Sequence, residues 1–191
     1  MRKTILVVAS VALAVLIAGG GAYAATINSC PGFKNGQGDV CEGTPQDDII
    51  HGGDLPNAIL GLAGKDTIYA GGGGDAVAGG SGSDLLYGGP GADGLNGGGR
   101  RSSQDPQLDS STDYVHGGRG PDGIRGGFAK GGVDRLYGEM GNDFFYASQR
   151  QHSFTPVTKE IIDCGPGNDE VRSFDKGLDV VKANCEHRHG F

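Results

Sequence analysis

An aspartate recurs every nine residues through the middle of this chain, and that period limits what the chain can fold into. From Gly43 to Asn96, six nine-residue blocks follow one another without a gap. The period resumes after an interruption, and we count twelve blocks up to Lys182. The sixth position of a block is Asp in eleven of the twelve, with Asn57 as the exception, and the eighth position is always apolar. Recurrence of this length indicates a repeat architecture in which each block is one structural unit.

Each block divides into a turn and a short strand. Glycine is frequent at positions one, two and four, where it allows tight turns and positive φ angles. The last three positions, such as Thr67-Ile68-Tyr69 and Leu85-Leu86-Tyr87, are β-formers. Because strand side chains alternate between faces, the middle one of the three is expected to point inward.

The blocks resemble the glycine-rich nonapeptide G-G-x-G-x-D-x-U-x, where U is apolar, of the RTX or haemolysin-type calcium-binding repeat family. The resemblance covers roughly residues 43 to 182. It implies an all-β fold, a right-handed parallel β-roll (β-solenoid), in which two blocks complete one coil. Each block would then stack on the block two further along, at the strand spacing of about 4.8 Å.

Stacking of this kind would place the aspartates in columns, where their charges need a counter-ion. Two bare charges about 4.8 Å apart repel by roughly 0.9 kcal/mol in bulk water, and by several times more near a protein surface. Ca2+ suits such columns because it accepts six to eight oxygen ligands in flexible geometry. We therefore expect several calcium ions, and repeats that are largely disordered until the ions bind.

The candidate ligands are the sixth-position carboxylates and the glycine turns that face them. The predicted metal-binding residues are Asp66, Asp75, Asp84, Asp93, Asp122, Asp134 and Asp143, with Gly71, Gly73, Gly80, Gly82, Gly89 and Gly91. The first four aspartates form one predicted tract and the other three a second, in which an insertion at residues 129–131 makes the Asp134 site doubtful. The blocks of Asp48 and Asn57 are expected to cap one end of the array, and those of Asp169 and Asp179 the other. In the competing interpretation, each aspartate only hydrogen-bonds its own turn.

The N-terminus and the cysteines indicate export. A basic start, an apolar stretch from Ile5 to Ala18 and the sequence Ala22-Tyr23-Ala24 are typical of a secretory signal peptide, and no membrane span is expected after its removal. In a secreted chain four cysteines favour disulfides, and local pairing would join Cys30 to Cys41 and Cys164 to Cys185. A zinc site built from all four thiolates is the alternative, but their spacings do not resemble close C-x-x-C pairs.

The chain is expected to form one domain. The predicted organisation is a signal peptide at 1–24, an N-terminal lead with the first cysteine pair at 25–42, β-roll repeats at 43–146 with an insertion at 99–112, a second insertion at 147–163, and C-terminal repeats or a cap with the second cysteine pair at 164–191. Val157 to Asp163 could add a strand, and His187-Arg188-His189 is expected to be a solvated tail.

Composition and motifs exclude several functions. A formal net charge of -7 argues against nucleic acid as a partner. The chain lacks the H-E-x-x-H and G-x-S-x-G motifs, so we expect no enzyme activity. The favoured function is a secreted calcium-binding module with a structural or adhesive role; any protein or glycan partner is left open. The alternative is a carbohydrate-binding or carbohydrate-active protein on the same solenoid, with Tyr69, Tyr87, Tyr137 and Tyr146 as a sugar-stacking stripe. Ordinary stacking of outward aromatic rings along a sheet is the simpler interpretation.

Overall fold

The protein is a flattened coil of short parallel strands. The computed structural model describes residues 26–28, 30, 32, 40–98, 111–127, 132–147 and 158–190, so the predicted signal peptide lies outside the described residues. Within these ranges the regular structure is entirely β, and no helix there could cross a membrane. The all-β parallel roll predicted from the repeats is confirmed.

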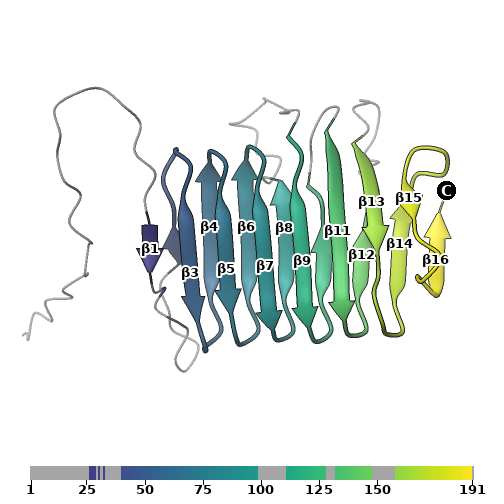
Figure 1. Cartoon of the computed structure of the whole chain (residues 1–191), viewed down its shortest axis with the longest axis horizontal. Helices are drawn as coiled ribbons and strands as arrows, with labels where there is room; N and C mark the ends of the chain where they lie inside the picture. The colour runs from purple at the N-terminus through teal and green to yellow at the C-terminus, as the bar shows by residue number, and fades with distance from the viewer. Residues whose placement is uncertain are drawn as a thin grey trace, which may run out of the picture.

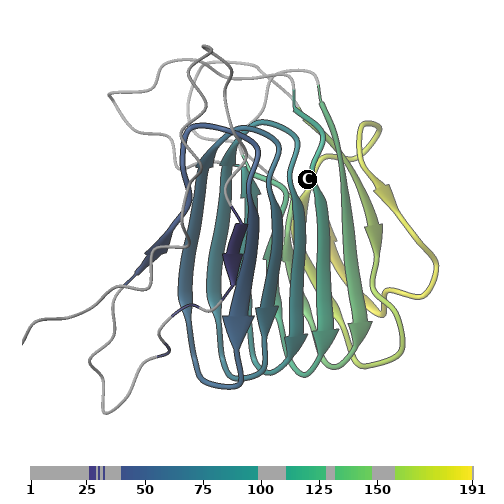
Figure 2. The same cartoon turned by 60° about the vertical axis from the view of Figure 1, so that its left-hand side comes forward.

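Successive strands alternate between two parallel sheets that face each other (Figure 1 and Figure 2). The odd-strand sheet contains β1 (Thr26–Asn28), β3 (Ile49–Gly53), β5 (Thr67–Gly71), β7 (Leu85–Pro90), β9 (Tyr114–Arg119), β11 (Val133–Met140), β13 (Lys159–Asp163) and β15 (Val180–Val181). The even-strand sheet contains β2 (Cys41–Glu42), β4 (Ala58–Ala63), β6 (Ala76–Ser81), β8 (Gly94–Gly98), β10 (Gly123–Arg125), β12 (Phe144–Tyr146), β14 (Glu170–Phe174) and β16 (His187–Gly190).

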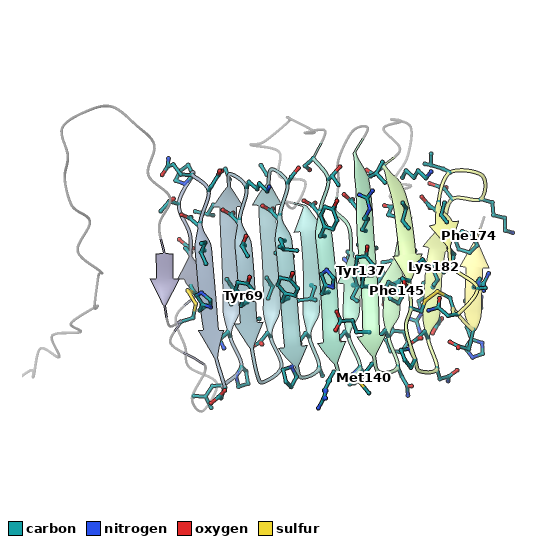
Figure 3. The ribbon with its side chains drawn as sticks, viewed as in Figure 1. Tyr69, Tyr137, Met140, Phe145, Phe174 and Lys182 are labelled. Carbon is teal, nitrogen blue, oxygen red and sulfur yellow. A yellow bond between two sulfur atoms is a disulfide. The ribbon has the colours of Figure 1, made fainter. Side chains whose placement is uncertain are left out.

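The apolar eighth positions stack between the sheets and form the core. Ile50 pairs with Ile68 and Ile68 with Leu86, so a full coil takes eighteen residues where no insertion intervenes. The same column continues through Val115, and a matching column on the even-strand sheet includes Phe145, which is fully buried. Phe174 packs against the C-terminal end of this core (Figure 3).

The turns of the coil lie along two edges that differ in regularity. We call the edge entered from the odd strands the regular edge, because the first six positions of each block carry no insertion there. These six-residue segments, which we call its turns, are 52–57, 70–75, 88–93, 117–122, 138–143 and 164–169, and most of them include the last residues of the preceding strand. We call the other the insertion edge, because the connections from β8 to β9, β10 to β11 and β12 to β13 all exceed that length there. The regular edge is the lower edge in Figure 1.

Both ends of the coil extend further than the repeat pattern indicates. β1 and β2, which lie in the predicted lead 25–42, add a strand to each sheet. β13 lies in the predicted insertion 147–163 and pairs with β11, so Val157 to Asp163 does contribute a strand. The residues His187-Arg188-His189 are exposed to solvent, as expected, but they are not an unpaired tail, because they form β16 and pair with β14. Arg188 stands at the inward register position and donates to the carbonyl oxygens of Cys185 and Ala183.

Two disulfides cross-link the ends of the coil. Cys30 is bonded to Cys41 and Cys164 to Cys185, which are the two local pairs. All four cysteine side chains are buried. With every thiol in a disulfide, the zinc alternative has no ligands left.

Two residues other than glycine, Leu62 and Glu139, have a positive φ, and Leu62 gives a first prediction. Leu62 occupies the second position of its block, which is glycine in most blocks, and its φ of 86° lies in the left-handed region. Replacement by glycine relieves a strain of about 1–2 kcal/mol. Because glycine also increases the entropy of the unfolded chain, we expect Leu62→Gly to stabilise the protein by up to about 1 kcal/mol. Urea unfolding in calcium measures this.

The matched control for Leu62→Gly is Leu60→Gly in the same strand. Leu60 is not among the residues with positive φ, so glycine there should destabilise the protein. Equal destabilisation by both variants would show that the backbone at Leu62 is not strained.

Candidate metal centre

The sixth-position acids form a buried column along each edge. On the regular edge the column contains Asp75, Asp93, Asp122, Asp143 and Asp169, preceded by Asn57, and each of these side chains is at most 3% exposed. On the insertion edge it contains Asp48, Asp66, Asp84, Asp113, Asp134 and Glu160, each at most 1% exposed. Each acid stands at the start of a strand, so the pairing of the strands sets the spacing of the acids.

Consecutive acids of a column are linked by hydrogen bonds. The backbone N–H of Asp93 donates to Oδ1 of Asp122 at 2.9 Å, and the N–H of Asp122 donates to Oδ1 of Asp143 at 2.9 Å. The same link continues from Asp143 to Asp169 at 2.8 Å. On the insertion edge the links run from Asp48 to Asp66, Asp84, Asp113 and Asp134 at 2.9–3.0 Å. Most carboxylates therefore hydrogen-bond the neighbouring coil, and not their own turn as the competing interpretation requires.

The second oxygen of these carboxylates is buried with no hydrogen-bond partner. This holds for Oδ2 of Asp66, Asp75, Asp93, Asp122, Asp143 and Asp169. An unpartnered buried carboxylate oxygen costs more than about 1–3 kcal/mol, because that is the cost for a neutral polar group. Six such atoms in regular array point to a ligand that the protein chain itself does not supply.

The surroundings of the unpartnered oxygens contain backbone carbonyls. A Cβ added to Gly117 would lie 2.6 Å from Asp122 Oδ2 and 2.7 Å from the carbonyl oxygen of Gly138. A Cβ on Gly138 would similarly lie 2.4 Å from Asp143 Oδ2 and 2.3 Å from the carbonyl oxygen of Cys164. First-position glycine therefore leaves space in which a carboxylate oxygen and a carbonyl oxygen of the next coil come together.

Burial raises the pKa of the column acids. The pKa is about 6 for Asp66, Asp93 and Asp143 and about 7 for Asp122. Loss of hydration is the largest cause in each case, and the negative charges of neighbouring acids add to it. For Asp122 those neighbours are Asp93, Asp143 and Glu139. A cation bound among the acids would favour their charged form and so offset both causes.

The structure arranges the predicted ligands differently from the two predicted tracts. Asp75, Asp93, Asp122 and Asp143 share the regular edge without interruption, whereas Asp66, Asp84 and Asp134 share the insertion edge. Gly71, Gly73, Gly89 and Gly91 lie in turns of the regular edge, and Gly80 and Gly82 in a turn of the insertion edge. The insertion at residues 99–112 therefore does not separate the acids of the regular edge.

Several acids of the columns were missed as candidate ligands. Asp113 and Asp169 carry the sixth-position signal but were left out, and Asp169 is as buried as the central acids. Glu160 and Glu186 take the same place at the start of β13 and β16, although their blocks lack the glycines of the repeat. At Asp48 a carboxylate oxygen accepts hydrogen bonds from Thr44, as expected for a capping end.

The donor set defines the kind of ion that fits. Among the described residues no three acidic, histidine or cysteine side chains converge on one point, so a bound ion must also take backbone carbonyl oxygens. A site of carboxylate and carbonyl oxygens suits Ca2+, whereas Zn2+ prefers nitrogen and sulfur, and Mg2+ requires a stricter octahedron. The fold and its buried acids define a calcium-binding parallel β-roll.

Comparison with known families gives the same class. The family model of the RTX calcium-binding nonapeptide repeat matches in four copies, at residues 42–77, 51–86, 69–99 and 128–149. The chain therefore carries repeats similar to those of that family at residues 42–99 and 128–149, and RTX repeats bind Ca2+. Searches of curated proteins and of solved structures found no match to the chain.

The raised pKa values predict an unusual pH dependence without calcium. An acid whose pKa is raised on folding binds more protons in the folded state, so the folded state gains stability as the pH falls from about 7 toward 4. We expect the small strand signal that remains in chelator to be larger at pH 5 than at pH 8. In saturating calcium the trend should reverse, because protons compete with the ion. Circular dichroism at both pH values, with chelator and with calcium, would measure this, and parallel trends in the two conditions would contradict it.

Proposed function

We propose that the chain is a secreted, calcium-loaded β-roll that folds as it binds Ca2+ and acts as a structural or adhesive module outside the cell. The single observation that carries calcium loading is the array of buried carboxylate oxygens without partners along the regular edge, with Asp66 as a further example on the insertion edge. Two disulfides are compatible with an oxidising compartment. The predicted signal peptide at 1–24 also supports export.

The residues proposed to hold the ions are the column acids together with backbone carbonyls of their turns. On the regular edge these acids are Asp75, Asp93, Asp122, Asp143 and Asp169, and on the insertion edge Asp66, Asp84, Asp113 and Asp134. Bound calcium would neutralise the acids and link successive coils. The role of the chain is to bring the oxygens of neighbouring coils together and to exclude water from them.

The aromatic side chains on the outer face of the odd-strand sheet do not favour the carbohydrate alternative. His51, Tyr69, Tyr87, His116 and Tyr137 form one continuous stack, with ring centroids 4.6–5.1 Å apart. Figure 3 shows Tyr69 and Tyr137 at the same height across the sheet. Each inner ring has both faces covered by its neighbours, so a sugar would meet only ring edges. Tyr146 lies on the other sheet and is not part of the stack.

Calorimetric titration of the mature protein with Ca2+ tests the proposed function. We expect binding of more than one ion, and Asp122→Asn should weaken the affected sites by on the order of tenfold or more. Asp54→Asn is the matched control, because Asp54 is an exposed acid on the same edge. Absence of calcium binding, or equal effects of the two variants, would contradict the proposal.

A further inference from the structure

We propose that the C-terminal end of the regular edge carries an additional calcium site, whose carboxylates come from Asp169 and Glu186 and whose shape is held by the Cys164–Cys185 disulfide. The inference rests on the proposed calcium loading of the roll. It concerns residues 164–186, which lie beyond the four matched copies of the repeat.

Asp169 shares the burial and the hydrogen bonding of the acids at the centre of the column, although the first position of its block is Cys164 and not glycine. Its side chain is 0% exposed, and its Oδ1 accepts the backbone N–H of Asp143 at 2.8 Å. Its Oδ2 is buried and has no partner. A turn containing Gly165, with a φ of 88°, leads into it. Asp169 therefore carries a buried, unsatisfied carboxylate oxygen, as Asp122 and Asp143 do.

Glu186 takes the place that an aspartate takes in the other coils. Its Oε2 accepts the backbone N–H of Asp169 at 3.0 Å, which is the hydrogen bond that links successive acids elsewhere in the column. The backbone N–H of His187 donates to the carbonyl oxygen of Asp169 at 3.0 Å, so β16 is in register. The column therefore ends on a carboxylate, supplied by a side chain one methylene longer than Asp.

The two ends of the regular column differ in charge, and this difference indicates an ion at the C-terminal end. At the N-terminal end the column stops at Asn57, whose amide is neutral and donates to the carbonyl oxygen of Leu55. At the C-terminal end the backbone N–H of Asp169 donates to Oε2 of Glu186, so the column ends on an acid. The nearby cation Arg188 donates to carbonyl oxygens of Cys185 and Ala183. The N-terminal end of the column is closed by an amide and the C-terminal end by a second carboxylate, and a cation between Asp169 and Glu186 would offset the repulsion of these two acids.

The Cys164–Cys185 disulfide joins the two segments that carry these acids. Cys164 is the first residue of the turn that ends at Asp169, and Cys185 directly precedes Glu186. Their Cα atoms are 5.2 Å apart, and both side chains are at most 2% exposed. The segment 182–186 contains no glycine, so it cannot pack against its neighbour as the glycine turns do. The Cys164–Cys185 disulfide instead holds this segment against the turn 164–169, and so keeps Glu186 next to Asp169.

Calcium stoichiometry and affinity of the full mature protein test this site. We expect Glu186→Gln to bind one ion fewer than the wild type, or to bind its weakest ion at least about tenfold less tightly. Glu42→Gln, which removes an exposed acid at the opposite end, should leave both quantities unchanged. The double variant Cys164→Ser/Cys185→Ser should weaken the same ion, whereas Cys30→Ser/Cys41→Ser should not.

The outcomes separate this inference from the proposed function. A wild-type protein that binds no calcium would overturn both. A wild-type protein that binds calcium, with Glu186→Gln equal to Glu42→Gln, would overturn the terminal site alone. Equal loss of affinity in the two disulfide variants would show that Cys164–Cys185 stabilises the whole coil and not this site. Because Glu186→Gln is a conservative change at an exposed residue, it remains informative if a cysteine variant does not fold.

Discussion

Replacement of Gly120 by alanine is expected to destabilise the calcium-loaded protein by about 3–5 kcal/mol. Gly120 is a fourth-position glycine of the regular edge, with a φ of 130°. A Cβ there would lie 1.5 Å from the carbonyl oxygen of Gly91 in the preceding coil. The contact is with backbone, so it can be relieved only by separating two coils. Urea unfolding in saturating calcium measures the change.

Gly53→Ala is the matched control for Gly120→Ala. Gly53 is also a repeat glycine on the regular edge, but a Cβ there would meet no atom within 4 Å, and its φ is not positive. We expect this variant to change the free energy of unfolding by less than about 1 kcal/mol. Comparable destabilisation by both variants would mean that the glycines serve chain flexibility and not close approach between coils.

Removal of calcium is expected to abolish most of the strand structure. A ligand at one hundred times its dissociation constant adds about 2.7 kcal/mol of stability per site. Three or more such sites would match the 5–15 kcal/mol by which a typical domain is stable. Circular dichroism should therefore show little strand signal in chelator and full signal in millimolar Ca2+. The measurement should be repeated on reduced protein, because the two disulfides restrict the unfolded chain.

Two observations would contradict calcium-dependent folding. The first is a complete strand signal in chelator after reduction of both disulfides. The second is equal recovery of the signal in millimolar Mg2+, since the smaller ion demands a stricter octahedral geometry.

Much of the fold could be predicted because particular residue types recur at fixed positions of the nine-residue block. The apolar eighth position gave the core column of Ile50, Ile68 and Leu86, and the sixth position gave the buried acids. These positions are readable because each must satisfy a local requirement, burial in one case and a turn carboxylate in the other. The pairing between coils follows from the period alone where no insertion interrupts it.

The parts that could not be predicted depend on contacts between distant segments. β13 and β16 lack the glycines of the repeat, and they are held by pairing with β11 and β14. The sequence also does not show that one edge is free of insertions. All three insertions fall between an even strand and the following odd strand, and this becomes apparent only when the strands are assigned to two sheets. Alternate blocks therefore had to be assigned to separate edges before Asp93 and Asp122 could be recognised as neighbours.

The stacked aromatic rings make the near-ultraviolet spectrum of the protein depend on whether its coils are paired. Tyr69 and Tyr87 lie parallel within 1° at a centroid separation of 5.0 Å, although eighteen residues separate them in the chain. Transitions of two phenol rings this close and this well aligned couple with one another, and the sequence contains no tryptophan to mask them. The near-ultraviolet spectrum thus distinguishes wound from unwound molecules without any attached label.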